Sequence, residues 1–139
     1  MSYEIKYDGF AEFPSFQYVG VQISNAQNEH YIPQKGKIDT GAYMTVIPEY
    51  MVKLLNLKSP TIEEAGGFDS DVREHDAYFV NVKIDDLVYP YVKVITQSDK
   101  RRQNVLVGRN LLNLWHMKLN GETHKGEFTS FSQNPIDAT

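Results

Sequence analysis

The chain of 139 residues is long enough for one domain with its own core, and its 41% hydrophobic and 23% charged residues are ordinary for a globular protein. Its formal net charge of −4 argues against nucleic acid as the main partner, and no apolar run reaches the ~20 residues of a membrane span. Zero cysteines exclude disulfides, thiolate metal sites and cysteine nucleophiles. The N-terminus has no apolar signal-peptide core, so a cytoplasmic setting is expected.

The first half of the chain predicts two strands and a helix. Residues Phe16–Ser24 alternate in the manner of a half-buried strand. Their predicted inward face is Val19, Val21 and Ile23. A second strand-like run, YIPQKGKID, leads to Asp39. The segment Pro48–Leu57 predicts a helix, because proline suits the first helical position and the apolar residues form a stripe. Asn56 can end this helix in a left-handed conformation.

The second half predicts further strands and a shorter helix. The predicted strands are Ala77–Ile84, Leu87–Ile95 and Asn104–Gly108. The segment Arg109–Trp115 is typical of a short helix, and Asn120-Gly121 indicates a hairpin between two strand-like arms. Together the elements predict one mainly antiparallel β domain over residues 16–131 with two small helices. Residues 132–139 are expected to be a disordered tail, and residues 1–15 an extension that is either an interface strand or a cover over the site.

Asp39 ends an apolar strand and is followed by Thr40, Gly41 and Ala42. A lone aspartate after a strand is usually a turn residue, but that interpretation does not explain these neighbours. Gly41 lets the backbone approach closely, Ala42 keeps the adjacent space small, and the Thr40 hydroxyl can bond to a symmetry mate. Such an arrangement suits two carboxylates around one water, because like charges that close share one proton and provide both a base and an acid.

The chain contains this Asp-Thr-Gly motif only once. The segment Phe68–Asp71 comes nearest to a second copy, but Asp71 stands where glycine would be needed. One chain therefore supplies half of such a site. A two-fold homodimer supplies the other half, because an isologous interface places Asp39 against its own copy near the axis.

Two segments together resemble the retropepsin-like (retroviral-type) aspartic protease family. IDTGAYMTVI looks like the active-site loop of the family, and NVLVGRNLLNLW looks like its apolar strand, Gly-Arg-Asn/Asp and short helix. Between them, Glu63–Asp71 lies where the family has its flap. The resemblance covers Phe16 to Phe128, and the inserted Pro48–Leu57 helix is more similar to bacterial and archaeal members. It implies a closed antiparallel β-barrel-like fold with two short helices and one lobe per chain.

The resemblance also implies roles for individual residues. Asp39 would be the catalytic carboxylate, Thr40 would bond across the dimer axis, and Gly41 would bind the substrate main chain. The implied substrate-binding set is Ala42, Tyr43, Gly66, Gly67, Phe68 and Leu106, with Tyr43 either a pocket wall or a packed core residue. Gly108 and Arg109 would be structural, since a guanidinium can brace the active-site loop through several donors. Tyr43 and Met44 replace the acidic residues of many viral members, so Arg109 would lack its usual ionic partner and the outer subsites should be more apolar.

These observations predict an aspartic endopeptidase that acts as a homodimer on extended, apolar-rich peptides without a cofactor, nucleic acid or membrane partner. The alternative is a catalytically weak or inactive dimerisation or peptide-binding module of the same fold. A group of acidic residues with one histidine also suggests a metal site. Its candidate ligands are Asp69, Asp71, Glu74, His75 and Asp76. This group lacks the glycine and terminal glutamate of a calcium loop, so a solvated flap without metal is expected.

Overall fold

The computed structural model describes residues 1–8, 16–58, 61–65, 73–97 and 103–131. It contains ten strands and two short helices. In chain order these are β1 (Ser2–Asp8), β2 (Phe16–Asn25), β3 (Ile32–Ile38), β4 (Thr45–Pro48), α1 (Glu49–Leu54), β5 (Thr61–Ala65), β6 (Arg73–Ile84), β7 (Leu87–Gln97), β8 (Val105–Val107), α2 (Arg109–Leu112), β9 (Trp115–Asn120) and β10 (Lys125–Ser130). The expectation of a disordered tail at 132–139 lies outside the described residues. None of the described helices is long and apolar enough to cross a membrane.

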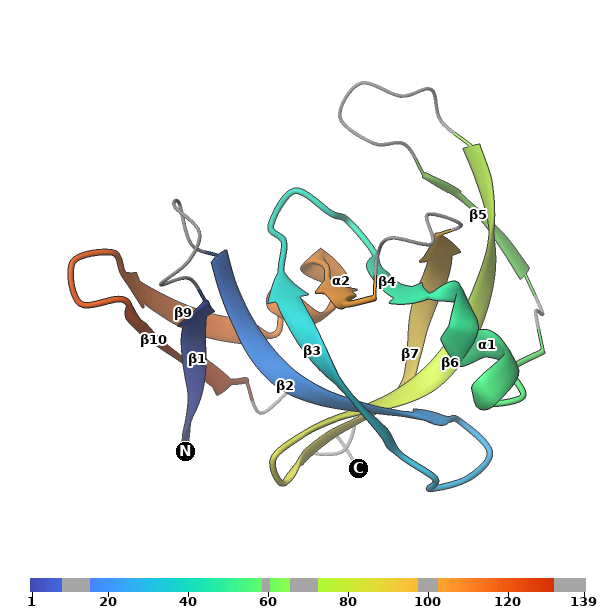
Figure 1. Cartoon of the computed structure of the whole chain (residues 1–139), viewed down its shortest axis with the longest axis horizontal. Helices are drawn as coiled ribbons and strands as arrows, with labels where there is room; N and C mark the ends of the chain where they lie inside the picture. The colour runs from blue at the N-terminus through green and yellow to red at the C-terminus, as the bar shows by residue number, and fades with distance from the viewer. Residues whose placement is uncertain (9–15, 59–60, 66–72, 98–102, 132–139) are drawn as a thin grey trace.

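Six of the strands close into a barrel (Figure 1). The strand order β6-β7-β4-β8-β3-β2 is completed by pairing between β2 and β6, which removes the free edges of this part of the sheet. The expected barrel with two short helices is therefore confirmed. Its pairing is mixed, because β3 runs parallel to β8 and β4 runs parallel to β7. These two parallel pairs bring the strands before and after the Asp39 loop against strands from the second half of the chain.

The alternating strands have the inward faces expected from their sequences. Val19, Val21 and Ile23 of β2 are buried, as are Tyr78, Val80, Val82 and Ile84 of β6. This confirms the period-2 pattern, because successive side chains of a strand point to opposite faces. Together with residues from the other strands they form one hydrophobic core inside the barrel.

Both helices are shorter than their sequences predict. Pro48 precedes α1 with an extended backbone, φ −61° and ψ 145°, and Asn56 lies in the left-handed region at φ 52° just after it. The expected end at Asn56 is thus close to the observed one, while Pro48 lies before the helix instead of in it. The predicted Arg109–Trp115 helix ends at Leu112, because Trp115 is buried at the start of β9.

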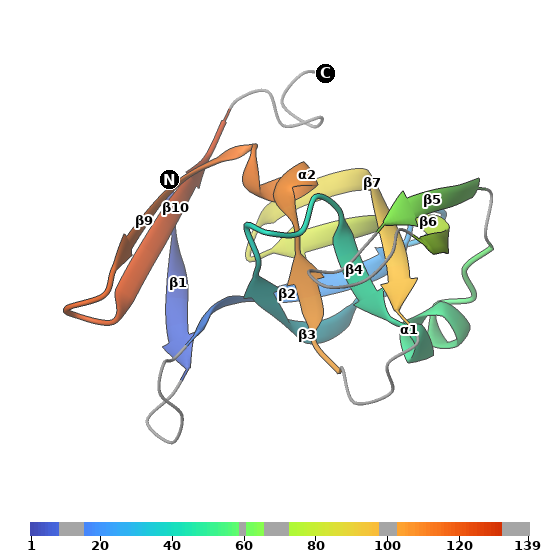
Figure 2. The same ribbon diagram turned by 90° about the horizontal axis from the view of Figure 1, so that it is seen from above.

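Three strands form an arm that projects from one side of the barrel (Figures 1 and 2). β1 pairs with β10 and β2, and β9 pairs with β10, so the N-terminal segment lies between the barrel and the C-terminal hairpin. The hairpin was predicted, and a strand was one of the two alternatives for residues 1–15, whereas β4 and β5 were not assigned as strands from the sequence. β5 pairs with the start of β6.

An aromatic cluster attaches the arm to the barrel. The ring of Phe128 stacks on Trp115 at a centroid distance of 3.8 Å and on Tyr3 at 5.1 Å. Trp115 Nε1 donates to Tyr89 OH at 2.8 Å, and Tyr3 OH donates to Asp86 Oδ1 at 2.8 Å. Burial, together with the neighbouring Asp86 carboxylate, raises the pKa of Tyr3 to about 12. The root of the arm is therefore packed and hydrogen-bonded to the β6–β7 end of the barrel.

Candidate active site

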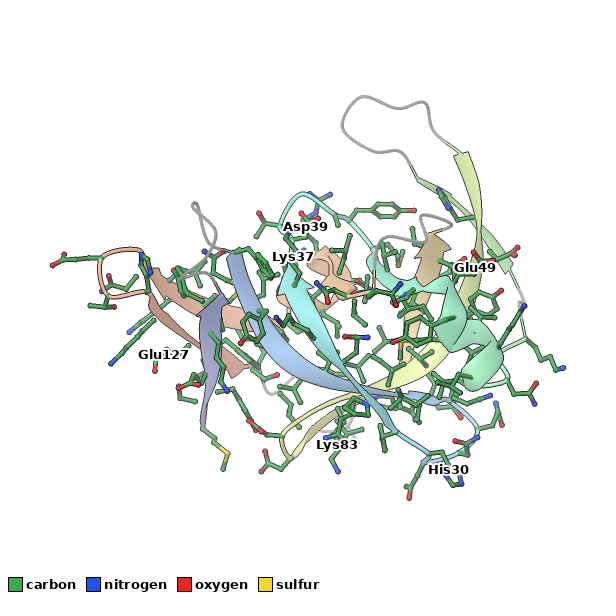
Figure 3. The ribbon with its side chains drawn as sticks, viewed as in Figure 1. His30, Lys37, Asp39, Glu49, Lys83 and Glu127 are labelled. Carbon is green, nitrogen blue, oxygen red and sulfur yellow. The ribbon has the colours of Figure 1, made fainter. Side chains whose placement is uncertain are left out.

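Asp39 directly follows β3 and continues its parallel pairing with β8. The Asp39 N–H donates to Val107 O at 3.1 Å, and the Ala42 N–H donates back to Asp39 O at 3.1 Å, which closes a tight turn. The Gly41 N–H donates to Asp39 Oδ1 at 3.0 Å, so the loop itself orients the half-buried carboxylate. A Cβ on Gly41 would lie 3.2 Å from that same oxygen, tighter than most Cβ contacts. Figure 3 shows Asp39 in the loop between β3 and β4.

Arg109, the first residue of α2, is hydrogen-bonded to this loop. Its backbone N–H donates to Ala42 O at 2.8 Å, and its Nη1 donates to Thr40 O at 3.1 Å. One residue thus satisfies carbonyls at both ends of the Thr40–Ala42 turn. Among the residues that the structure describes, no carboxylate lies within ion-pair distance of Arg109. Its guanidinium therefore acts on the loop through the neutral carbonyl of Thr40.

Glycine is required at position 108, where the start of α2 touches the backbone of Met44 and Thr45. A Cβ at this position would lie 2.5 Å from both C and O of Met44 and 2.8 Å from N of Thr45. These are backbone atoms, which cannot rotate away as the end of a side chain can. A residue larger than glycine would therefore separate α2 from the active-site loop.

The buried Thr45 and the half-buried Asn110 form a hydrogen-bond network that was not expected from the sequence. The N–H and Oγ1 of Thr45 donate to Asn110 Oδ1 at 2.9 and 2.8 Å. Thr45 Oγ1 accepts from the Gly108 N–H at 3.1 Å, and Asn110 Nδ2 donates to Lys93 O at 2.8 Å. The network joins β4, β7 and α2 directly behind the loop. The signal in the sequence was a threonine and an asparagine within two otherwise apolar segments.

The structure describes only some of the residues that were predicted to bind substrate. Leu106 of β8 lies opposite both Lys37 and Val46, is nearly buried, and is outside the main core cluster. Ala42 is half-buried and Tyr43 is 37% exposed, so Tyr43 is not a packed core residue. Three predicted residues, Gly66, Gly67 and Phe68, lie outside the described part of the chain.

The arrangement leaves one carboxylate in an open loop. Thr40 and Gly41 are exposed beside the half-buried Asp39, so another chain or a peptide can approach them. One of the Asp39 oxygens accepts from Gly41, which keeps the carboxylate in a fixed direction. A single ionised carboxylate can take a proton but cannot donate one at the same time. Within the described residues, no group of three or more His, Asp or Glu side chains is placed to hold a metal ion.

No protein-family profile matches the sequence, and no curated protein matches it. Among solved structures, the chain is similar to a retropepsin-like aspartic protease from Rickettsia conorii, with a TM-score of 0.63 and 12% identity over 92% of this chain and 90% of that one. It is similar to EIAV protease complexed with the inhibitor HBY-793, with a TM-score of 0.52 and 16% identity over 76% of this chain and 92% of that one. A foamy viral protease-reverse transcriptase, in complex with an RNA/DNA hybrid, matches with a TM-score of 0.51 and 15% identity over 74% of this chain and 13% of that one.

Identities in this range establish a shared architecture and leave the activity to be argued from the site. The matched architecture is the one that the two segments around Asp39 and Gly108 had indicated. The chain therefore has the fold of the retropepsin-like aspartic proteases.

Proposed function

We propose that the chain is an aspartic endopeptidase whose active site forms when two copies associate about a two-fold axis. The observation that carries the proposal is the Asp39 loop, in which one carboxylate is oriented by Gly41 and braced by Arg109 yet left open on one side. One such loop supplies only half of an acid–base pair. A second copy supplies the other half, since an isologous interface places equal residues opposite one another.

The proposed chemistry uses one water held between the two Asp39 carboxylates. Two carboxylates in contact share one proton, because ionising both would place like charges side by side. The ionised Asp39 takes a proton from the water, which then attacks the peptide carbonyl. The protonated Asp39 bonds the carbonyl oxygen and later helps to protonate the leaving nitrogen. No covalent intermediate and no metal are required.

The surrounding residues take supporting roles in this proposal. The Thr40 hydroxyl bonds across the axis, and the exposed Gly41 leaves room for the main chain of an extended peptide. Ala42, Tyr43 and Leu106 line the space for its side chains. Gly66, Gly67 and Phe68, between β5 and β6, are proposed to cover the bound peptide. Such a site favours extended, apolar-rich substrates because Ala42, Tyr43 and Leu106 carry no charge.

The test is cleavage of a peptide library by the wild type and by Asp39→Asn. Asparagine keeps the shape of the side chain but cannot act as the base, so turnover should be lost. Asp85→Asn is a matched control, because Asp85 is exposed in the β6–β7 turn at φ 53°, which asparagine tolerates. This control should cleave as the wild type does.

Two further measurements separate this mechanism from others. The rate should follow a bell-shaped pH profile, because only the singly protonated pair is active, and it should not respond to a chelator. Specific activity should fall on dilution once the dimer dissociates. Cleavage that persists in Asp39→Asn would exclude the proposed mechanism, and full activity of a monomer would exclude the shared site. Peptide binding without turnover at any pH would favour a binding module.

A further inference from the structure

Lys37 lies beside Asp39 on the outward face of β3. Asp39 follows β3 two positions after Lys37, and its N–H continues the pairing with β8, so the two side chains point to the same side, about 7 Å apart along the chain. Gly36 and Ile38, which alternate with them, are buried and face the barrel core. Figure 3 shows Lys37 and Asp39 close together at this end of the barrel. Lys37 is thus on the face that carries the carboxylate.

The register with β8 places Lys37 next to a predicted pocket residue. Lys37 is paired with Leu106 in the parallel β3–β8 ladder, and directly paired residues point to the same face of a sheet. Leu106 is nearly buried but does not belong to the main core cluster. The surface next to Asp39 therefore combines the apolar Leu106 side chain of β8 with the Lys37 cation of β3.

An aromatic contact holds the ammonium group of Lys37. Its Nζ lies 4.9 Å from the ring centroid of Phe16 on the neighbouring β2, within the range of a cation–π attraction. Among the described residues, no carboxylate lies within ion-pair distance of Lys37. The side chain is half-buried, so its charge is less screened than that of a fully exposed lysine. The site thus presents a positioned cation that has no ion-pair partner in the described part of the chain.

We propose that Lys37 determines specificity by binding the carboxylate of an aspartate or glutamate next to the scissile bond of the peptide. This inference rests on the proposed peptidase function and names one acidic position within an otherwise apolar substrate. An extended peptide with its carbonyl at Asp39 places the flanking side chains beside the outward faces of β3 and β8. Since a two-fold dimer contains two copies of Lys37, the acidic residue is accepted on either side of the scissile bond.

The experiment uses peptides of one apolar sequence that differ only in having Glu, Gln or Lys beside the scissile bond. The measured quantity is the ratio of kcat/KM for the Glu peptide to that for the Gln peptide. Wild type should favour Glu by about two- to fivefold, the effect expected of a partly exposed ion pair, and less at high salt. Lys37→Met should bring the ratio to about one, and Lys37→Glu should instead favour the Lys peptide.

Lys83→Glu is the matched control for these variants. The Lys83 Nζ also lies over an aromatic ring, at 5.5 Å from the centroid of Tyr31, but on the part of the barrel away from Asp39 (Figure 3). This variant changes the net charge by the same amount as Lys37→Glu and should keep the wild-type ratio. A change of equal size in Lys83→Glu would mean that the preference follows net charge and would overturn the inference.

Equilibrium binding of the same peptides to Asp39→Asn separates the inference from the peptidase function. Cleavage with an equal Glu to Gln ratio in wild type and Lys37→Met would overturn the role of Lys37 and leave the activity intact. Tighter binding of the Glu peptide, lost when Lys37→Met is added, would support the inference even without turnover. If no peptide is either bound or cleaved, both proposals are wrong.

Discussion

Replacing Thr45 with valine removes one hydroxyl from behind the active-site loop and keeps the shape of the side chain. Thr45 is completely buried, and its Oγ1 donates to Asn110 Oδ1 at 2.8 Å and accepts from the Gly108 N–H at 3.1 Å. In the variant Asn110 Oδ1 still accepts from the Thr45 backbone N–H. The Gly108 N–H loses its acceptor in a buried position, and such a group costs about 1–3 kcal/mol.

The free energy of unfolding should therefore fall by about 1–3 kcal/mol. Unfolding in urea can be followed through the fluorescence of Trp115, the single tryptophan. With a denaturant slope of about 2 kcal/mol/M, the midpoint should fall by about 0.5–1.5 M while the slope stays the same. Protein concentration must be held constant across variants, because dimerisation contributes to the measured stability.

Thr129→Val is the control, since Thr129 is exposed on β10 and its replacement should change stability by less than about 0.5 kcal/mol. Equal effects of Thr45→Val and Thr129→Val would refute the argument that the buried hydroxyl supports the loop. A double-mutant cycle with Asn110→Ala tests the shared bond, because the two changes should together cost less than their sum.

Two further predictions concern packing and pH. Gly108→Ala should destabilise the protein by about 1–3 kcal/mol or more in the same urea assay, because the added Cβ would lie 2.5 Å from the Met44 backbone. Gly20→Ala, whose Cβ would meet nothing within 4 Å, is its control, and a loss of equal size there would contradict the prediction. Because burial raises the pKa of Tyr3 to about 12, the folded state keeps this proton longer than the unfolded state, and stability should fall from about pH 10 to 12. Tyr3→Phe should flatten this decline, and an unchanged decline would show that other groups cause it.

Local regularities in the sequence were sufficient to predict much of the barrel and to single out the Asp39 loop. Alternation in Phe16–Ser24 and Ala77–Ile84 identified two strands and their inward faces, because a strand sorts its side chains with a period of 2 whatever it pairs with. The Asp39 loop is also local, since Gly41 and Ala42 both bond to Asp39 within three residues. A motif made of such short-range contacts can be recognised without knowing the fold.

The elements that the sequence did not predict correctly share one cause, which is contact between residues far apart in the chain. The sequence left residues 1–15 as either a strand or a cover, and Ser2–Asp8 becomes a strand because it pairs with β10 near the other end of the sequence. The Arg109–Trp115 pattern favoured a longer helix, but Trp115 is buried against Phe128 and hydrogen-bonded to Tyr89, and it begins a strand instead. Tertiary packing thus overrode a weak local helical preference.

The sequence alone contained one Asp-Thr-Gly motif and the Gly108-Arg109 segment expected to support it, and these predicted one catalytic carboxylate per chain. Only the tertiary structure joined Thr45 to Asn110, 65 residues away, and placed Lys37 beside Leu106 on the face that carries Asp39. The physical reason is that strand register decides which side chains share a face. Register depends on closure of the whole barrel, through contacts such as β2 with β6, and no short stretch of residues encodes it.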